Sequence, residues 1–179
     1  ISMRVVSSLQ IELTEGEQAR IWQDKIMNSD VYKKHLRLTS NWGEGTREGL
    51  ERCGQLAQEI IDIAPESGIG YRWLGWYHYG LVMRGISPRE NVKKAFKLAQ
   101  KALSIDEHEG FSHCLLGFVY LLMKKYDKAI GSGKRSVELQ PNGAMVHLTL
   151  GSTLNYAGHF DEAMVHLKQA IRLNPFPHY

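Results

Sequence analysis

Two 34-residue segments follow each other without a gap near the end of this chain: residues 110–143 read GFSHCLLGFVYLLMKKYDKAIGSGKRSVELQPNG, and residues 144–177 read AMVHLTLGSTLNYAGHFDEAMVHLKQAIRLNPFP. Four landmarks recur at one offset: Leu116-Gly117 as Leu150-Gly151, Tyr126-Asp127 as Phe160-Asp161, Val137-x-Leu139 as Ile171-x-Leu173, and Pro141 as Pro175. A register shared by four landmarks indicates a duplicated structural unit.

The second half of each segment has the apolar periodicity of an amphipathic helix. Ala163, Leu167, Ala170 and Ile171 form one stripe at a period of 3.6 residues. Small residues fall where the two helices of a pair would cross, and a bulky side chain there would cost roughly 1–3 kcal/mol through overpacking. These small residues are Gly117, Ala129, Gly151 and Ala163. The pattern therefore predicts two closely packed helices in each segment.

This period and its landmarks resemble the tetratricopeptide repeat, in which antiparallel helix pairs stack on their neighbours. The resemblance implies an all-α fold, a right-handed helical-hairpin solenoid, and we expect an N-terminal helical segment before it. We predict five units: an N-terminal helical segment and linker from an upstream domain over 1–28, a degenerate helix pair over 29–67, an expanded repeat over 68–109, a repeat over 110–143, and a repeat with the start of a further one over 144–179.

Local signals predict the boundaries of several helices. Residues 41–45 read Asn-Trp-Gly-Glu-Gly and are expected to form a loop. In the expanded repeat, Leu74-Gly75 precedes Leu116-Gly117 by 42 residues, and the surplus of eight is expected around residues 84–88. Caps are predicted from residue type and position: Ser87 with Glu90 before a helix that starts at Pro88, Asn142 before the next-to-last helix, and Gly158 after it.

The composition of the chain argues against several classes of partner and site. With 22 Lys+Arg and 19 Asp+Glu in 179 residues, the formal charge of +3 is too small to indicate a nucleic-acid or membrane partner. The longest uncharged apolar run, residues 114–123, is well short of the roughly 18 residues that a membrane span requires. Cys53 and Cys114 have no ligand-like spacing, so we expect two reduced thiols and a cytoplasmic location. We take the chain to be a piece of a longer protein.

A second resemblance concerns the start of the chain. Residues 13–20, LTEGEQAR, precede the repeats, and this junction is similar to that of bacterial class III adenylate/guanylate cyclase-like proteins, as is LNYAG at residues 154–158. The resemblance implies a nucleotide cyclase domain upstream of Ile1, with its metal-binding aspartates outside this chain. It also implies that the repeats form a regulatory or assembly tail.

The tetratricopeptide resemblance also implies a binding surface, because the first helix of each pair lines a concave groove that holds a peptide or a partner helix. The register places nine residues there: Arg72, Trp76 and Tyr79 in the expanded repeat, Phe118, Leu121 and Leu122 in the next, and Ser152, Asn155 and Tyr156 in the last. Apart from Arg72 and Asn155, the chain lacks the lysine and asparagine clamp of members that bind chaperone tails. Two occupants stay open: a protein or peptide partner, or the chain itself, through its N-terminal helices 3–26 or a second copy.

Other motifs are interpreted as structural. The basic stripe Arg89, Lys93, Lys97 and Lys101 is expected to be a solvated helix face, so no nucleic-acid partner is expected. Residues 131–134 read Gly-Ser-Gly-Lys but lack the first glycine and the Ser or Thr of a phosphate-binding loop. His113 and His147 share a repeat position, with His166 on the paired helix, and no spaced carboxylate or thiolate completes a metal site.

We therefore predict a non-catalytic scaffold for protein–protein interaction, without cofactor, metal or catalytic residues in this segment. The alternative is a self-association module, and a nucleic-acid-binding helical repeat ranks behind both. Whether the longer protein is an enzyme depends on the upstream domain.

Overall fold

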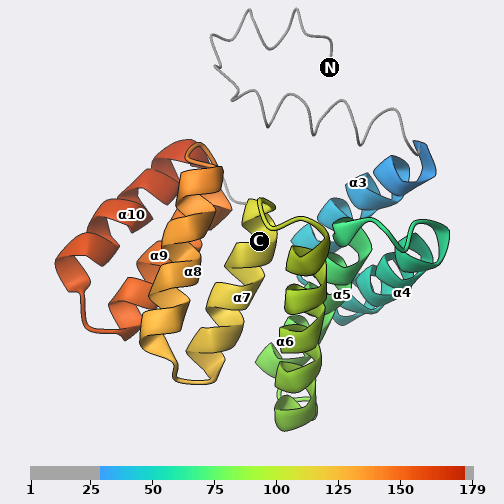
Figure 1. Cartoon of the computed structure of the whole chain (residues 1–179), viewed down its shortest axis with the longest axis horizontal. Coiled ribbons are helices and arrows are strands. Elements are labelled where there is room, and N and C mark those ends of the chain that lie inside the picture. The colour runs from blue at the N-terminus through green and yellow to red at the C-terminus, as the bar shows by residue number, and fades with distance from the viewer. Residues whose placement is uncertain (1–28, 176–179) are drawn as a thin grey trace, which may run out of the picture.

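The computed structural model describes residues 29–175, and within that range the chain forms eight helices and no strand (Figure 1). In chain order they are α3 (Ser29–Gly43), α4 (Arg47–Ile63), α5 (Gly68–Met83), α6 (Pro88–Ile105), α7 (Gly110–Leu122), α8 (Tyr126–Leu139), α9 (Ala144–Tyr156) and α10 (Phe160–Leu173). The predicted all-α fold is confirmed. The helices predicted within residues 3–26 lie outside the described residues.

Consecutive helices form four pairs, α3–α4, α5–α6, α7–α8 and α9–α10, which stack in order along the molecule (Figure 1). Each second helix contacts the first helix of the next pair, and α7 also contacts both α5 and α9. The first helices therefore form an inner layer, with the second helices outside it. This is the stacking of a solenoid, in which each unit is stabilised by its neighbours.

In the last three pairs, glycines at equivalent positions let the two helices approach closely. A Cβ atom added to the glycine would lie near the carbonyl oxygen of the small residue on the second helix: 3.7 Å for Gly75 and Ala95, 3.5 Å for Gly117 and Ala129, and 3.2 Å for Gly151 and Ala163. The same contact recurs in three pairs, so the predicted register corresponds to equivalent positions in space.

The loop predicted over residues 41–45 is wrong in its first three positions, because α3 continues to Gly43. Trp42 accounts for the extra turn: its ring packs edge-on against Trp73, with centroids 6.2 Å apart, and against Trp76, at 5.8 Å. The next helix starts where expected, since the Thr46 side chain accepts a hydrogen bond of 2.9 Å from the Gly49 amide. Tertiary packing of an aromatic ring thus overrides the loop preference of Asn41 and Gly43, while Gly45 stays in the loop.

Two predicted caps are also wrong. Ser87 precedes α6 and Pro88 starts it, but the Ser87 side chain makes no capping hydrogen bond and its φ is +39°. Asn91 stabilises this turn instead, because its amide donates to the Ile86 carbonyl at 2.7 Å. Before α9 the cap position is Gly143 rather than Asn142. Gly158, with φ of +87°, follows the end of α9 as predicted.

The eight surplus residues of the expanded repeat lie mostly in its helices. The helices α5 and α6 have 16 and 18 residues, against 13 and 14 in α7 and α8. The core continues through the longer pair: Leu38, Cys53, Ala95 and Leu115 are all fully buried in one cluster. None of the helices within residues 29–175 has the length and apolar character needed to cross a bilayer.

Candidate partner-binding cavity

A cavity of about 380 Å³ lies against the inner layer, and its walls come from all four helix pairs. The lining side chains belong to α3 (His35, Thr39, Trp42), α5 (Arg72, Trp73, Trp76), α7 (Phe111) and α9 (Met145). Asn174, just after α10, also lines it. Most of the wall is aromatic or aliphatic, and its volume is within the roughly 300–1,000 Å³ typical of ligand pockets.

A network of aromatic rings forms the rigid wall of the cavity and extends beyond it. Trp76 packs edge-on against Trp42, Tyr79 and Phe118, at centroid distances of 5.8, 5.4 and 5.9 Å. Each such pair stabilises the fold by about 0.5–1.5 kcal/mol beyond the area it buries. Trp76 is 8% exposed, so it contributes an edge to the cavity while most of its ring is in the core.

Arg72 is the one charged side chain among the described residues that line the cavity. It is only 6% exposed. Its Nη1 donates to Glu109 Oε1 at 2.5 Å, and its guanidinium lies 5.4 Å from the centre of the Phe111 ring and 5.7 Å from that of Trp73. Within residues 29–175, its buried Nε has no hydrogen-bond partner.

Glu109 completes this arrangement from the start of α7. It is the N-cap residue of that helix, and its Oε2 accepts from the Ser112 amide at 2.6 Å. The carboxylate therefore has two fixed partners, the Arg72 guanidinium and a helix N-terminus. The role of Glu109 was not predictable from the sequence, because it depends on a contact with a residue 37 positions earlier.

His35 is the second polar group of the wall. The indole Nε1 of Trp73 donates to its Nδ1 at 2.9 Å. Burial, together with the charge of Arg72, lowers the pKa of His35 to about 4. The ring is therefore neutral at pH 7, and the accepting role of Nδ1 assigns the remaining proton to Nε2.

The nine residues predicted to line the groove are distributed unevenly. Only Arg72 and Trp76 line the cavity, whereas Tyr79 and Phe118 pack against Trp76 without lining it. The other five, Leu121, Leu122, Ser152, Asn155 and Tyr156, are not among its lining residues, and Tyr156 is 68% exposed. A groove formed by all nine residues therefore stays a prediction.

Residues from the first turn of the inner helices were missed. Phe111 and Met145 line the cavity and are separated by the 34-residue repeat, so the register could have identified them together. His35 and Trp42 were harder to predict as cavity residues. They lie on α3, which belongs to the degenerate pair and was expected to end before Trp42.

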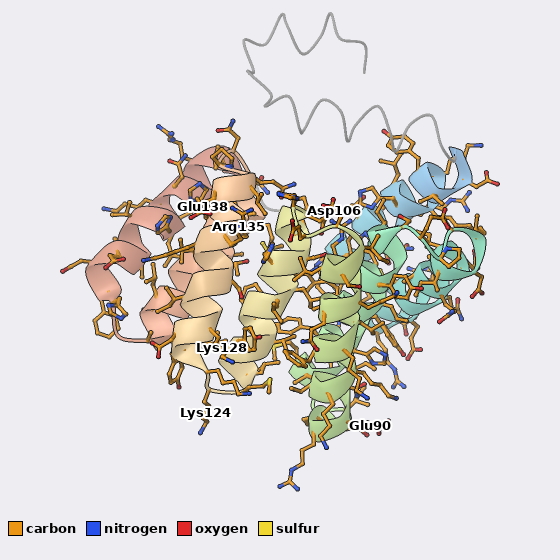
Figure 2. All side chains as sticks on the ribbon, in the orientation of Figure 1. Glu90, Asp106, Lys124, Lys128, Arg135 and Glu138 are labelled. Atoms are coloured by element: carbon orange, nitrogen blue, oxygen red, sulfur yellow. The ribbon has the colours of Figure 1, made fainter. Side chains whose placement is uncertain are left out.

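The charged side chains lie mainly elsewhere. Figure 2 shows Lys124, Lys128, Arg135 and Glu138 along the α7–α8 turn and α8. Arg135 Nη1 lies 3.1 Å from Glu138 Oε2 and forms an ion pair with it. The basic stripe of α6 is exposed along its whole length, as expected for a solvated face. Residues 131–134 lie inside α8, which agrees with rejecting a phosphate-binding loop.

The histidines of the last pair contact each other without forming a metal centre. His147 Nδ1 lies 3.0 Å from His166 Nδ1, and His147 Nε2 lies 2.9 Å from the Pro141 carbonyl. The ring nitrogens of His147 are thus both engaged. Across residues 29–175, no three His, Cys, Asp or Glu side chains converge closely enough to hold a metal ion.

Stacked helix pairs whose first helices surround an apolar cavity define this chain as a helical-repeat protein. The family model of the tetratricopeptide repeat matches residues 146–177. The crystal structure of TTC0263, a thermophilic TPR protein in Thermus thermophilus, is similar with a TM-score of 0.63 and 18% identity, covering 88% of this chain and 79% of that one. The similarity to TTC0263 shows a shared helical-repeat fold, and the family match concerns the last helix pair of this chain.

The chain is also similar in sequence to parts of two longer proteins. Transcriptional regulator HilA of Salmonella typhimurium is 23% identical over 187 residues, which cover 92% of this chain and 34% of that protein. Protein bimA of Emericella nidulans is 24% identical over 123 residues, covering 67% of this chain and 14% of that protein. The chain thus spans about a third of HilA and a smaller part of bimA.

Proposed function

We propose that this segment is a non-catalytic scaffold that binds a protein partner through the cavity on its inner layer. The observation that carries the proposal is the cavity itself, because an apolar wall built from all four helix pairs is typical of a binding site. Large apolar surfaces left uncovered are uncommon on monomeric proteins. A partner side chain would cover this one.

We further propose that the segment is the regulatory or assembly part of a multidomain signalling protein, at a cytoplasmic location. Its likeness to one third of a transcriptional regulator supports a multidomain setting. The buried free thiols of Cys53 and Cys114 support a reducing compartment. An upstream cyclase domain, and a bacterial source, stay predictions from the resemblance at residues 13–20.

A matched pair of variants on α3 tests the binding site. Thr39 lines the cavity and is exposed, so Thr39→Arg would place a long cationic side chain across it without disturbing the core. Ser40→Arg is the control, because Ser40 is exposed on the same helix and does not line the cavity. Peptides selected from a displayed random library on the native chain should bind Ser40→Arg normally and Thr39→Arg at least about tenfold more weakly. Equal binding to both variants would exclude the cavity as the site.

Self-association is the second candidate, and the outer face of α10 favours it. Ile130 and Val137 of α8 pack against the last pair, but their counterparts 34 residues later, Met164 and Ile171, are 52% and 66% exposed. A second copy could cover that face as α9 covers α8. Sedimentation equilibrium of the native chain and of Ile171→Glu separates the two candidates: a dimer lost in the variant supports self-association, and a monomer in both supports partner binding.

A further inference from the structure

We propose that the outer surface of α6 and the α7–α8 turn binds an acidic helix of a protein partner, at a site separate from the cavity. This basic surface consists of seven exposed cations: Arg89, Lys93, Lys97 and Lys101 of α6, and Lys124, Lys125 and Lys128 of the turn and the start of α8. None of them lines the cavity, whose walls come mainly from the inner helices α3, α5, α7 and α9. Partners at the cavity and at the basic surface would therefore bind independently.

The net positive charge of the chain comes from this surface. Residues 88–105 and 123–128 contain eight of the 22 Lys and Arg but only two of the 19 Asp and Glu, namely Glu90 and Asp127. The rest of the chain thus holds 14 Lys and Arg against 17 Asp and Glu, although the whole chain has a formal charge of +3. Solvated surfaces normally mix both signs, and a field of one sign attracts partners of the opposite charge.

The chain itself does not neutralise these cations. Glu90 is the one acid of α6, and it pairs with Lys94 at 2.7 Å. Asp127 lies in the first turn of α8, where the helix dipole stabilises a carboxylate. Within residues 29–175, none of the seven cations of the basic surface forms an ion pair. Their charge is therefore available to a partner.

Stacking of the repeats does not require a basic helix face. Ala95 of α6 and Ala163 of α10 occupy equivalent helix crossings. In that register, the α10 residues that correspond to Lys93, Lys97 and Lys101 are Asp161, Val165 and Gln169. Like charges four residues apart also destabilise a helix slightly. The basic stripe thus opposes helix stability without serving the fold, which favours a role in binding.

Aromatic contacts join the two parts of the basic surface. The Phe96 ring of α6 lies against Tyr120 of α7, with centroids 5.6 Å apart. Lys128 Nζ of α8 lies 5.8 Å from the centre of the same Tyr120 ring. Figure 2 shows Lys124 and Lys128 toward the same end of the molecule as Glu90 at the start of α6. The cations of α6 and of the turn therefore form one continuous surface.

The spacing of the basic stripe fits a partner helix. Its cations follow each other at every fourth residue, which is about 6 Å along a helix axis. Carboxylates at every fourth residue of a second helix repeat at the same distance, so a helix alongside α6 would bring one carboxylate to each cation. Nucleic-acid recognition favours the guanidinium fork of arginine, whereas all cations of this surface except Arg89 are lysines. An acidic protein helix fits these features better than a nucleic acid.

Two peptides of identical composition test the spacing. Each is a short alanine- and glutamine-rich helix with four glutamates, placed at every fourth residue in one peptide and consecutively in the other. Fluorescence anisotropy with the full chain, at about 50 mM salt, should show that the spaced peptide binds at least about fivefold more tightly. Salt of about 200 mM should weaken its binding at least about threefold, because the charges are exposed.

A matched pair of double variants assigns the binding to α6. Lys93→Glu with Lys97→Glu should lower the affinity for the spaced peptide at least about tenfold. Lys168→Glu with Arg172→Glu, at exposed positions of α10, changes the net charge equally and should leave the affinity within about twofold. Circular dichroism first establishes that both variants are folded. If the α6 variant is not, Lys93→Gln with Lys97→Gln replaces it and should lower the affinity at least about threefold.

Contrary results would overturn the inference. Equal losses in the α6 and α10 variants would show that only net charge matters, and equal binding of the two peptides would exclude a matched helix. No binding of the spaced peptide, or tighter binding of an oligothymidylate with four phosphates, would exclude an acidic helix as the partner. Thr39→Arg should leave binding of the spaced peptide unchanged, and a loss in that variant would assign the peptide to the cavity instead.

Discussion

Arg72 on α5 and Glu109 at the start of α7 form a buried ion pair that joins the second helix pair to the third, with Nη1 and Oε1 2.5 Å apart. The carboxylate also caps α7 through the Ser112 amide. The Glu109 side chain therefore connects the N-terminus of α7 to Arg72, the charged residue of the cavity wall. This connection makes the cavity sensitive to the stacking of the repeats.

Removal of one partner should be more damaging than replacement of both. Glu109→Ala leaves a buried guanidinium without its counter-charge and removes a cap, so the free energy of unfolding should fall by about 3–5 kcal/mol. The double variant Arg72→Met with Glu109→Gln contains no buried charge and retains an acceptor for the cap. Urea denaturation followed by circular dichroism should find it within about 1 kcal/mol of the native chain. A double variant as unstable as Glu109→Ala would contradict this account.

Stability should decrease as the pH falls below about 6.5, because of His35. Its pKa is about 4 in the folded chain, through burial and the charge of Arg72, and near 6.5 when unfolded. The unfolded chain then binds more protons in that range, so full stability is present above pH 6.5 and declines toward pH 4. The loss from His35 by pH 5 is about 2 kcal/mol. Burial also lowers the pKa of His78 and His166, which adds to the effect.

Urea midpoints at about pH 7.5 and about pH 5 measure this dependence. His35→Gln retains an acceptor for the Trp73 indole and cannot titrate, so the decline should be about 2 kcal/mol smaller in this variant. His159→Gln, at an exposed position, is the control and should leave the decline unchanged. An unchanged decline in His35→Gln would show that His35 is not its source.

Alanine substitution should have opposite effects on stability at two glycines. A Cβ at Gly151 would lie 2.8 Å from Leu167 Cγ and 3.2 Å from the Ala163 carbonyl oxygen, so Gly151→Ala should destabilise the chain by about 1–3 kcal/mol. Gly131 lies inside α8, is exposed, and has nothing within 4 Å of such a Cβ. Gly131→Ala should therefore stabilise by about 0.4–1 kcal/mol. Thermal unfolding of both variants measures the difference, and the same sign for both would be inconsistent with the helix crossing.

Equivalent residues of α8 and α10 should differ in their contribution to stability. Ile130 packs against Leu150 and Leu154, so Ile130→Ala should cost about 2 kcal/mol. Met164, its counterpart 34 residues later, is half exposed, and Met164→Ala should change stability by less than about 0.5 kcal/mol. Urea denaturation at several protein concentrations is the measurement. A large, concentration-dependent cost for Met164→Ala would instead indicate that another copy covers α10.

Much of the fold was decided by the sequence itself, because helix pairing depends on local pattern. The 34-residue period placed Gly117 and Gly151 at equivalent crossings, and periodicity placed the helices that carry them. The cavity was only partly predictable. Arg72 and Trp76 followed from the register, and Phe111 with Met145 could have, since all four lie at repeated positions on the inner helices.

Only the tertiary structure decided the rest. Trp42 extends α3 through contacts with Trp73 and Trp76, which are more than 30 positions away, and no local propensity predicts that turn. The pairing of Arg72 with Glu109 and the place of Asn174 beside the same cavity depend on how the pairs stack. Small rotations between neighbouring repeats add along the solenoid, so the distance between its ends is set by packing at every interface rather than by any one stretch of sequence.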